Sequence, residues 1–432
     1  KENIMDESIG MNAKGPYPHM NPVVAAYYDN GSQHRPPSGG RPKFHPDLID
    51  PNIITDLYYA FAIFGFVTKL LPGDGGPMLT GNYNIEPIHW NEHRILYKEV
   101  QDLKEINPSL CTILSIGGND FNNPKDPDMG QYTYKLFSEM ISTPENRKSF
   151  IDSVIEYALE YNFDGIDLHW PHVGDLTREG KPEDFVNFKK LLEECHKSFQ
   201  QTTPPLILTY ASPATIPQNV CEPYQSSPSL YFKWLGECAP FLDRFNVMAY
   251  DYDTSWDSPK ITRAIAPLYQ NTVPGERFYI EETIDNYIKG GVPSSKIVLG
   301  IANYGRSYQG VENLSTYDNG PGKPFTTLGD PGPSSGEAGL LSYFEISDAI
   351  ESGDLIFGVD ANTNTSYGYS LSSDEWASFD TPYNTALKTQ FAMDNHLLGC
   401  FFWTVNQEEY WHEPTYLNIY TAYARFYPYS PS

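Results

Sequence analysis

Short apolar runs alternate with amphipathic stretches along most of the chain. Eight runs are apolar enough to form strands covered on both faces, a pattern typical of parallel sheets. They span residues 23–28, 54–65, 110–118, a stretch that starts at 163, 206–211, 244–251, 296–304 and 397–405. Helical spacing of apolar residues predicts helices between most of these runs and after the last. These helices span residues 91–106, 144–161, 184–199, 231–239, 280–290, 385–395 and 416–427.

This alternation of strands and helices favours a parallel α/β fold. Eight strand-helix units predict a closed (β/α)8 TIM barrel formed by residues 21–307 and 385–432, with an open doubly wound sheet as the alternative. A barrel of this kind usually needs only about 250 residues. The turn-rich surplus at 308–384, with a helical segment at 342–352, predicts a small α+β insertion domain between strands seven and eight. Residues 1–20 are expected to form a loose arm, and residues 70–90 a long loop.

The fourth strand carries the most suggestive polar residues. Alternate residues of a strand share a face, so Asp167, His169 and Pro171 are expected to point the same way. Asp164 has the opposite parity unless the chain bulges at Gly165. Carboxyl and imidazole groups on one strand face suggest a reaction site, but proline can do no acid-base chemistry.

In a barrel, the functional site lies at the carboxyl ends of the strands. The residues expected there are largely aromatic, with a few carboxylates and one arginine, and such a cup suits sugars because aromatic rings stack on their C–H faces. They are Tyr27, Tyr28, Phe61, Ser115, Gly117, Gly118, Asp167, His169, Pro171, Tyr210, Met248, Tyr250, Asp251, Tyr304, Arg306 and Trp403.

Charge and cysteine content narrow the possible partners. The formal net charge of the 432-residue chain is -26, which disfavours nucleic acid and anionic membrane but leaves a neutral polysaccharide open. The longest apolar run, at 57–67, is too short to span a bilayer, which needs about 20 residues. The chain starts without an apolar signal segment and is expected to be processed or trimmed. Of five cysteines, Cys221 and Cys238 could form a disulfide.

Six motifs in the same order resemble family 18 glycoside hydrolases, the family of chitinases and chitinase-like lectins. The resemblance runs from Val23 to about Tyr427. Ser115-Ile-Gly-Gly118 resembles the strand-three motif, and Phe163-Asp-Gly-Ile-Asp167 resembles the start of the strand-four signature Asp-x-x-Asp-x-Asp-x-Glu. The other four are Asn246-Val-Met-Ala-Tyr-Asp251, Tyr304-Gly-Arg306, the strand-eight residue Trp403, and the insertion-domain segment Gly336-Glu-Ala-Gly-Leu-Leu-Ser-Tyr-Phe-Glu-Ile346.

The strand-four signature is degenerate in this chain. Asp164 and Asp167 are retained, but His169 replaces the third aspartate and Pro171 replaces the glutamate. The resemblance implies that this glutamate protonates the leaving oxygen, while the third aspartate orients the N-acetyl group that attacks the anomeric carbon. Loss of a general acid alone should lower the rate about 10²–10⁴-fold. Asn119 also stands where a stacking tryptophan is common.

The resemblance therefore implies a chitinase-like protein that binds chitin or N-acetylglucosamine oligosaccharides without hydrolysing them. We expect no cofactor, no metal ion, no nucleic acid or membrane partner, and a secreted or extracellular location. The implied sugar-binding residues are Tyr27, Phe61, Met248, Tyr250, Asp251, Tyr304, Arg306 and Trp403. Asp164 and Asp167 are expected to be buried scaffold residues, and His169 is expected to bond to Asp167 or Tyr250.

Three alternatives remain open from the sequence. Hydrolysis could use a displaced acid, either His169 or a side chain of the following loop, Asp175 or Glu179. His169, His172 and Asp175 could instead hold a metal ion. Finally, the early loops resemble chitinase subunits of bacterial insecticidal toxin complexes, which would fit a non-catalytic subunit of a larger protein complex.

Overall fold

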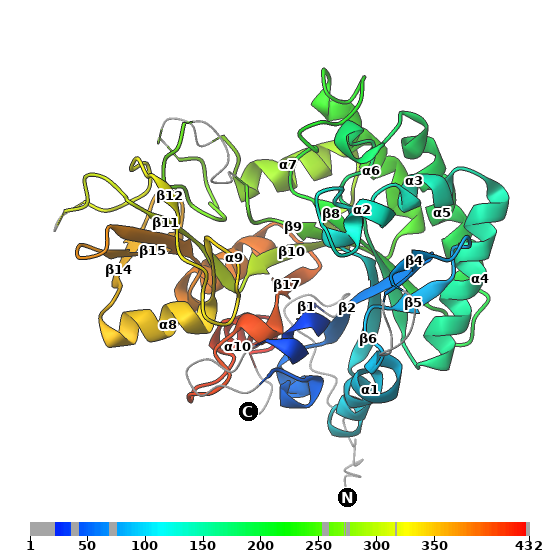
Figure 1. The fold of residues 1–432 in the computed structure, drawn as a ribbon, viewed down its shortest axis with the longest axis horizontal. Coiled ribbons are helices and arrows are strands. Elements are labelled where there is room, and N and C mark those ends of the chain that lie inside the picture. Colours follow the sequence, from blue (N-terminus) through cyan, green and yellow to red (C-terminus); the bar gives the residue numbers. More distant parts are fainter. Residues whose placement is uncertain are drawn as a thin grey trace, which may run out of the picture.

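Eight parallel strands close into a barrel in the computed structural model, which describes residues 22–35, 43–68, 76–252, 259–271, 273, 277–315 and 318–428 (Figure 1). The strands are β1 (Val23–Asp29), β2 (Asp56–Phe64), β6 (Cys111–Gly117), β7 (Gly165–His169), β8 (Ile207–Pro213), β9 (Arg244–Met248), β10 (Ile297–Ala302) and β17 (Gly399–Trp403). Because β1 pairs in parallel with both β2 and β17, the sheet closes. This closure confirms the predicted (β/α)8 barrel. The predicted arm at 1–20 lies outside the described residues.

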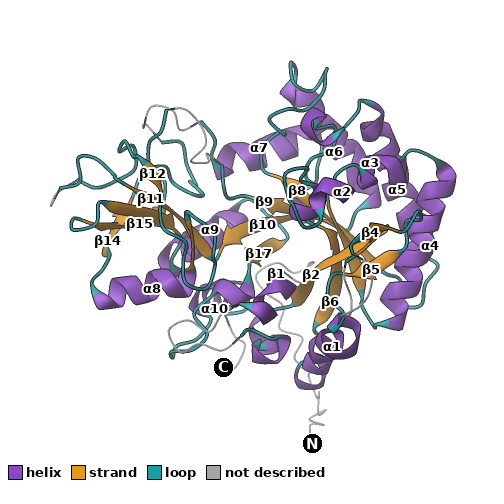
Figure 2. Cartoon of the chain, in the orientation of Figure 1, coloured by secondary structure: helices purple, strands orange, loops and turns teal. Residues whose placement is uncertain are grey.

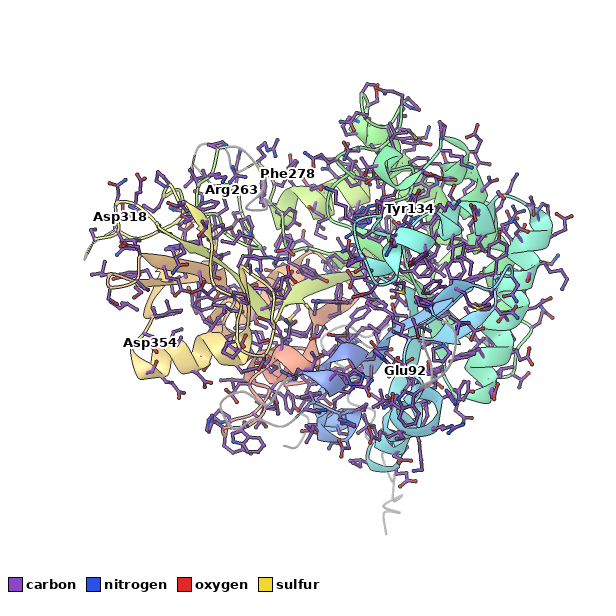
Figure 3. The ribbon with its side chains drawn as sticks, in the orientation of Figure 1. Glu92, Tyr134, Arg263, Phe278, Asp318 and Asp354 are labelled. Atoms are coloured by element: carbon purple, nitrogen blue, oxygen red, sulfur yellow. The ribbon has the colours of Figure 1, made fainter. Side chains whose placement is uncertain are left out.

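Two apolar layers, one on each face of the strands, explain why the strand sequences are apolar at consecutive positions. A small cluster inside the barrel contains Tyr27, Tyr58, Ile113, Val298 and Phe401. A much larger cluster lies between the outer face of the strands and the surrounding helices. Figure 3 shows the side chains that the strands and helices carry. Burial on both faces leaves few positions for polar residues in the strands.

Helices surround the barrel in the order that the sequence predicts (Figure 2). They are α1 (Tyr97–Ile106), α4 (Pro144–Glu160), α5 (Glu183–Phe199), α6 (Pro228–Cys238), α7 (Ile280–Gly290), α9 (Pro382–Asp394) and α10 (Leu417–Phe426). Helix α4 starts with Pro144 after Thr143, whose hydroxyl accepts a hydrogen bond from the Asn146 amide. No helix in the described ranges is both long and apolar enough to cross a membrane.

Several elements differ from the sequence prediction. The predicted helix at 91–106 begins with a π-helical turn at Glu92–Leu96 before α1. The predicted long loop at 70–90 contains the short strands β4 (Met78–Leu79) and β5 (Ile85–Pro87), and β4 pairs with β3 (Phe66–Val67). Two further short helices, α2 (Gly130–Thr133) and α3 (Leu136–Ile141), precede α4.

A second sheet follows β10 and precedes β17 (Figure 1, at the left). Its strands are β11 (Tyr304–Gln309), β12 (Thr327–Leu328), β13 (Leu340–Ser342), β14 (Ile356–Asp360), β15 (Thr365–Ser370) and β16 (Glu375–Phe379). Helix α8 (Tyr343–Ser352) starts with a capping box made by Ser342 and Glu345. The assignment of residues 308–384 to a separate insertion domain stays a prediction.

A single residue, Asn303, connects the barrel strand β10 to β11 of the second sheet. It is 1% exposed. The Asn303 backbone makes two hydrogen bonds: its amide donates to the Trp403 carbonyl at 2.8 Å, and its carbonyl accepts from the Tyr343 amide at 3.0 Å. The Asn303 side chain donates to the Thr404 carbonyl at 3.2 Å. The junction between the two sheets is therefore held by hydrogen bonds to two separate segments, Trp403–Thr404 and the start of α8.

Buried polar groups elsewhere are mostly paired. Lys388 on α9 is fully buried; its ammonium donates to the Asp380 carboxylate and, at 2.7 Å, to the Ala266 carbonyl.

All five cysteines are free thiols, so the disulfide considered for Cys221 and Cys238 does not form.

Candidate functional site

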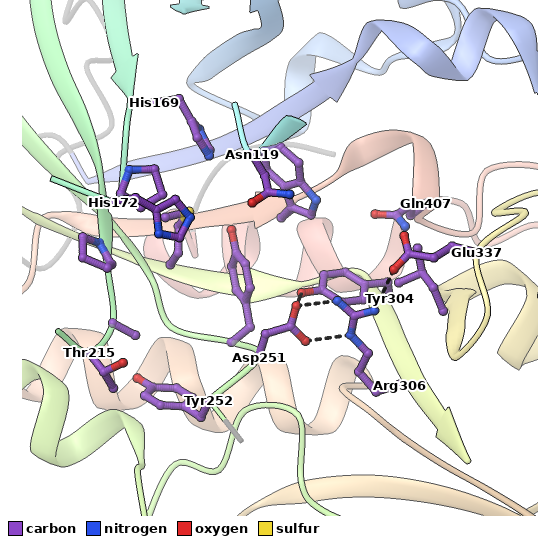
Figure 4. Close-up of a pocket in the computed structure, with 17 residues that line it drawn as sticks. Asn119, His169, His172, Thr215, Asp251, Tyr252, Tyr304, Arg306, Glu337 and Gln407 are labelled. Carbon is purple, nitrogen blue, oxygen red and sulfur yellow. Dashed lines mark hydrogen bonds and ion pairs between the residues drawn. The ribbon is translucent and has the colours of Figure 1, made fainter. Parts of the chain in front are cut away.

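A cavity of about 510 Å³ opens at the carboxyl ends of the barrel strands (Figure 4). Its wall combines side chains from the barrel with side chains from the second sheet. The lining residues are Asn119, His169, Pro171, His172, Pro213, Ala214, Thr215, Met248, Tyr250, Asp251, Tyr252, Tyr304, Arg306, Glu337, Leu340, Trp403 and Gln407. Six of the eight predicted sugar-binding residues are among them, but their role in binding stays a prediction.

Strand β7 sends alternate residues toward the barrel axis. It pairs with β6 in unbroken register from Gly165 to His169, so the chain has no bulge at Gly165. Asp164 consequently lies before the strand and away from the cavity, where its carboxylate bonds to Lys104 at 2.6 Å and to the Thr112 amide at 2.8 Å. Its side chain is 37% exposed, so the expectation of a buried scaffold residue is wrong for Asp164.

Asp167 lies inside the barrel, fully buried, and does not line the cavity. Its carboxylate accepts hydrogen bonds from three hydroxyls, those of Ser115 at 2.6 Å, Thr209 at 2.7 Å and Tyr27 at 3.0 Å. Burial raises the pKa of Asp167 from 3.8 to about 6, against the opposing effect of these hydrogen bonds. The three bonds tie strands β1, β6, β7 and β8 together inside the barrel.

Replacing Asp167 by asparagine should flatten the pH dependence of stability. Because folding raises the pKa of Asp167, the protonated carboxyl favours the fold. This stability is fully present below the unfolded pKa of 3.8 and is lost as the pH rises through about 6. Over that interval, the free energy of unfolding of the parent chain should fall by at most about 3 kcal/mol because of Asp167. In the Asp167→Asn variant this decrease should be absent. Urea unfolding at about pH 4 and about pH 7.5 measures the change.

The exposed Asp152 on α4 provides the matched control, since Asp152→Asn changes a carboxylate whose side chain is 62% exposed. This variant should keep the pH profile of the parent chain. Parallel pH profiles of the Asp167→Asn variant and the parent chain would contradict the assignment.

His169 points into the cavity but makes no hydrogen bond through Nδ1. It is 5% exposed and packs against the rings of Phe61 and Trp403, with centroid distances of 4.9 and 5.7 Å. The predicted bond to Asp167 or Tyr250 is wrong, because Asp167 is occupied by hydroxyls and the Tyr250 hydroxyl is itself buried without a partner. Burial lowers the pKa of His169 to about 3, so its imidazole is neutral at physiological pH.

Asp251, Tyr304 and Arg306 form one hydrogen-bonded group on the opposite side of the cavity (Figure 4). The Arg306 guanidinium binds the Asp251 carboxylate through two nitrogens, at 2.9 and 2.8 Å, and the Tyr304 hydroxyl donates to the same carboxylate at 2.7 Å. Arg306 also reaches Glu337 at 3.3 Å. The group joins the segment after β9 to the second sheet and presents fixed donors and acceptors to the cavity.

Two predicted binding residues, Tyr27 and Phe61, do not line the cavity but pack against residues that do. Tyr27 is 1% exposed and packs against Trp403, with ring centroids 5.2 Å apart. Phe61 packs against His169 and Trp403. Two further strand-end residues face the helices: the Tyr28 hydroxyl donates to the Phe44 carbonyl, and the Tyr210 hydroxyl donates to the Trp170 carbonyl.

Sequence reasoning did not assign several lining residues. These are Pro213, Ala214, Thr215, Tyr252, Glu337, Leu340 and Gln407. Most lie in loops after strands, where no periodicity indicates the direction of a side chain. Proximity to a motif is the one signal that could have found some of them, since Tyr252 follows Asp251 and Glu337 lies in the segment that begins at Gly336.

Of the residues considered as displaced acids or metal ligands, His169 and His172 line the cavity, whereas Asp175 and Glu179 do not. Asp175 is 5% exposed and bonds to the Thr177 amide and hydroxyl, whereas Glu179 accepts a hydrogen bond from Tyr134. His172 Nδ1 lies 3.9 Å from the Asp175 carboxylate. Among the described residues, no three His, Cys, Asp or Glu side chains are grouped so that they could hold a metal ion.

Comparison with known proteins gives a consistent match along the chain. The model of glycosyl hydrolases family 18 matches residues 23–408. Chitinase-3-like protein 2 of Homo sapiens is 26% identical over 390 residues, covering 90% of this chain and 87% of that protein. Chitotriosidase-1 of Mus musculus is 27% identical over 396 residues, covering 90% and 73%.

A solved structure has a similar fold. It is that of human YKL-39, described as a pseudo-chitinase with retained chitooligosaccharide binding properties. It aligns with a TM-score of 0.73 at 24% identity, over 93% of this chain and 98% of that one.

Proposed function

Because this chain belongs to glycosyl hydrolase family 18, we propose that it binds chitin or N-acetylglucosamine oligosaccharides in its cavity and does not hydrolyse them. The chain has a chitinase-like fold, and its relatives include both a chitinase-like protein and a chitotriosidase. The observation that carries the proposal is a cavity rich in aromatic residues whose wall contains Pro171 and His169 instead of two carboxylic acids.

The cavity suits a sugar because apolar rings and polar groups converge in it. Trp403 and Tyr250 offer aromatic surfaces, while Asp251 and Arg306 are held in place by their mutual bonds. Rings that stack on C–H faces, combined with a few oriented polar groups, are typical of carbohydrate sites.

The absence of hydrolysis is inferred from the groups that face the cavity. Among the described residues, two carboxylates line it, Asp251 and Glu337. Both are held in ion pairs with the Arg306 guanidinium. His169 is neutral and contributes no proton, because its pKa is about 3. Among the wall residues that the structure describes, none is therefore suited to donate a proton to a leaving oxygen.

Replacing Trp403 by alanine tests the binding proposal. We expect the variant to bind the N-acetylglucosamine hexamer about tenfold or more weakly, because the largest stacking surface of the wall is lost. Isothermal titration calorimetry gives the affinity. Trp411→Ala is the matched control, since Trp411 is 51% exposed and does not line the cavity. No heat from the unmodified protein with the hexamer, together with no competition by it, would refute the proposal.

Release of reducing ends from the same hexamer at high protein concentration would instead support an enzyme with a displaced acid. An extracellular location and membership of a larger complex, such as a toxin complex, stay proposals as well. Co-purification of the chain with larger proteins would support the second of these.

A further inference from the structure

The cavity and its rim are more acidic than a neutral sugar requires. Its lining contains two carboxylates, Asp251 and Glu337, against one guanidinium, that of Arg306. His169 and His172 add no positive charge, since burial lowers the pKa of each to about 3.

A further carboxylate lies at the rim. Asp120 follows the lining residue Asn119 and is exposed, although partial desolvation of its carboxyl group raises the pKa of Asp120, as do the nearby charges of Asp126, Glu337 and Asp128. Glu337, from the segment before β13, and Asn119, next to Asp120 in the loop after β6, line the same cavity, so Glu337 and Asp120 lie at its rim from separate parts of the chain. Among the described lining residues, Arg306 is the one cation, and it is shared between Asp251 and Glu337.

Acceptors without partners lie deeper in the cavity. Nδ1 of His169 and the hydroxyl oxygen of Tyr250 are buried and make no hydrogen bond within the protein. His169 is 5% exposed, and both residues line the cavity. A neutral imidazole nitrogen and a phenol oxygen can each accept a hydrogen bond, and an ammonium group supplies three donors. Buried polar atoms of this kind are stabilised when a ligand pairs them.

We propose that the cavity binds partly or fully N-deacetylated chitin oligosaccharides, whose glucosamine units carry ammonium groups, more tightly than fully N-acetylated ones. The inference rests on the proposed sugar-binding function and deepens it by naming the sugar class. Glu337 and Asp120 attract the ammonium groups at the rim, and His169 and Tyr250 accept hydrogen bonds from one that enters. A cleft lined by one sign of charge concentrates ligands of the opposite sign.

Calorimetry with two ligands tests this preference. The glucosamine hexamer should bind about tenfold more tightly than the N-acetylglucosamine hexamer at low salt, and the advantage should shrink at about 0.3 M salt because exposed charges are screened. Displacement of one hexamer by the other shows that both occupy the same cavity. A hexalysine peptide serves as a polycation without sugar rings.

Three variants distinguish attraction of the ligand by the rim carboxylates from attraction by the net negative charge of the chain. Glu337→Gln and Asp120→Asn should each reduce the preference for the glucosamine hexamer by about fivefold, near the upper limit for one partly exposed ion pair. The Asp120 variant matters because Asp120 makes no bond to Arg306, so its effect cannot come from displacement of that side chain. Glu160→Gln, an exposed position at the end of α4, should leave both affinities unchanged.

The outcomes distinguish this inference from the proposed function. If the N-acetylglucosamine hexamer binds and the glucosamine hexamer binds no more tightly, the inference is wrong and the proposed function stands. If neither hexamer binds, both are wrong. If hexalysine binds as tightly as the glucosamine hexamer, or if Glu160→Gln weakens binding as much as Glu337→Gln, the attraction is non-specific and the inference is again wrong.

Discussion

The double replacement of His169 by Asp and Pro171 by Glu should create hydrolytic activity toward N-acetylglucosamine oligomers. Both positions face the cavity from β7 and the residues that follow it, so the new side chains project toward a bound sugar. Glu at 171 supplies a proton donor, and Asp at 169 supplies the carboxylate expected to orient the N-acetyl group. We expect reducing ends to appear at least about 100-fold faster than with the unmodified chain.

An isosteric control identifies the proton donor. His169→Asp combined with Pro171→Gln preserves the shape of the side chain at 171 but provides no transferable proton, so it should remain inactive. Equal rates for the Gln and Glu versions would mean that position 171 does not supply the acid. If the Glu version binds the hexamer but does not cleave it, the two replaced residues are not the only obstacle to catalysis.

Lys388→Met should be the most destabilising single substitution considered for this chain. The Lys388 ammonium is fully buried and paired with Asp380, which is 1% exposed. Removing one member leaves the other charged group, or its protonated form, in an apolar environment, at a cost of about 3–5 kcal/mol. Urea unfolding at neutral pH gives the change in the free energy of unfolding.

Two further variants distinguish the destabilisation caused by an unpaired buried charge from the effect of losing a lysine side chain in general. Lys388→Met with Asp380→Asn removes both charges and should recover much of the lost stability. Lys98→Met on α1 breaks an exposed pair with Asp102, and should leave the unfolding midpoint unchanged within error. If Lys388→Met is as harmless as Lys98→Met, the buried pair contributes little.

The barrel could be predicted because its strands are covered on both faces. Residues such as Val24 and Ala25 are both fully buried, although they point to opposite sides of β1. This double burial produces the apolar runs that were visible in the sequence. The loop at 70–90 carries no such signal, because Met78 and Leu79 of β4 are both exposed.

Strand parity explains which site residues could be placed. It placed His169 on the cavity side, and it placed Asp164 on the other parity once β7 proved free of a bulge. Parity alone did not choose between neighbouring aromatic residues such as Tyr27 and Tyr28, which point in opposite directions. Hydrogen-bond partners were harder to predict than side-chain directions. The Asp167 carboxylate accepts hydrogen bonds from hydroxyls on three other strands, and Nδ1 of His169 has no partner.

The bonds around Asn303 bear on how fast a ligand can enter and leave. A hinge opening between the barrel and the second sheet would have to break its bond to Tyr343 on one side, or its bonds to Trp403 and Thr404 on the other. The cavity walls should therefore be preorganised, so little conformational entropy is lost on binding and association should approach the rate of simple diffusional encounter. The Asn303 and Tyr343 amides should also exchange with solvent deuterium as slowly as the barrel strands do.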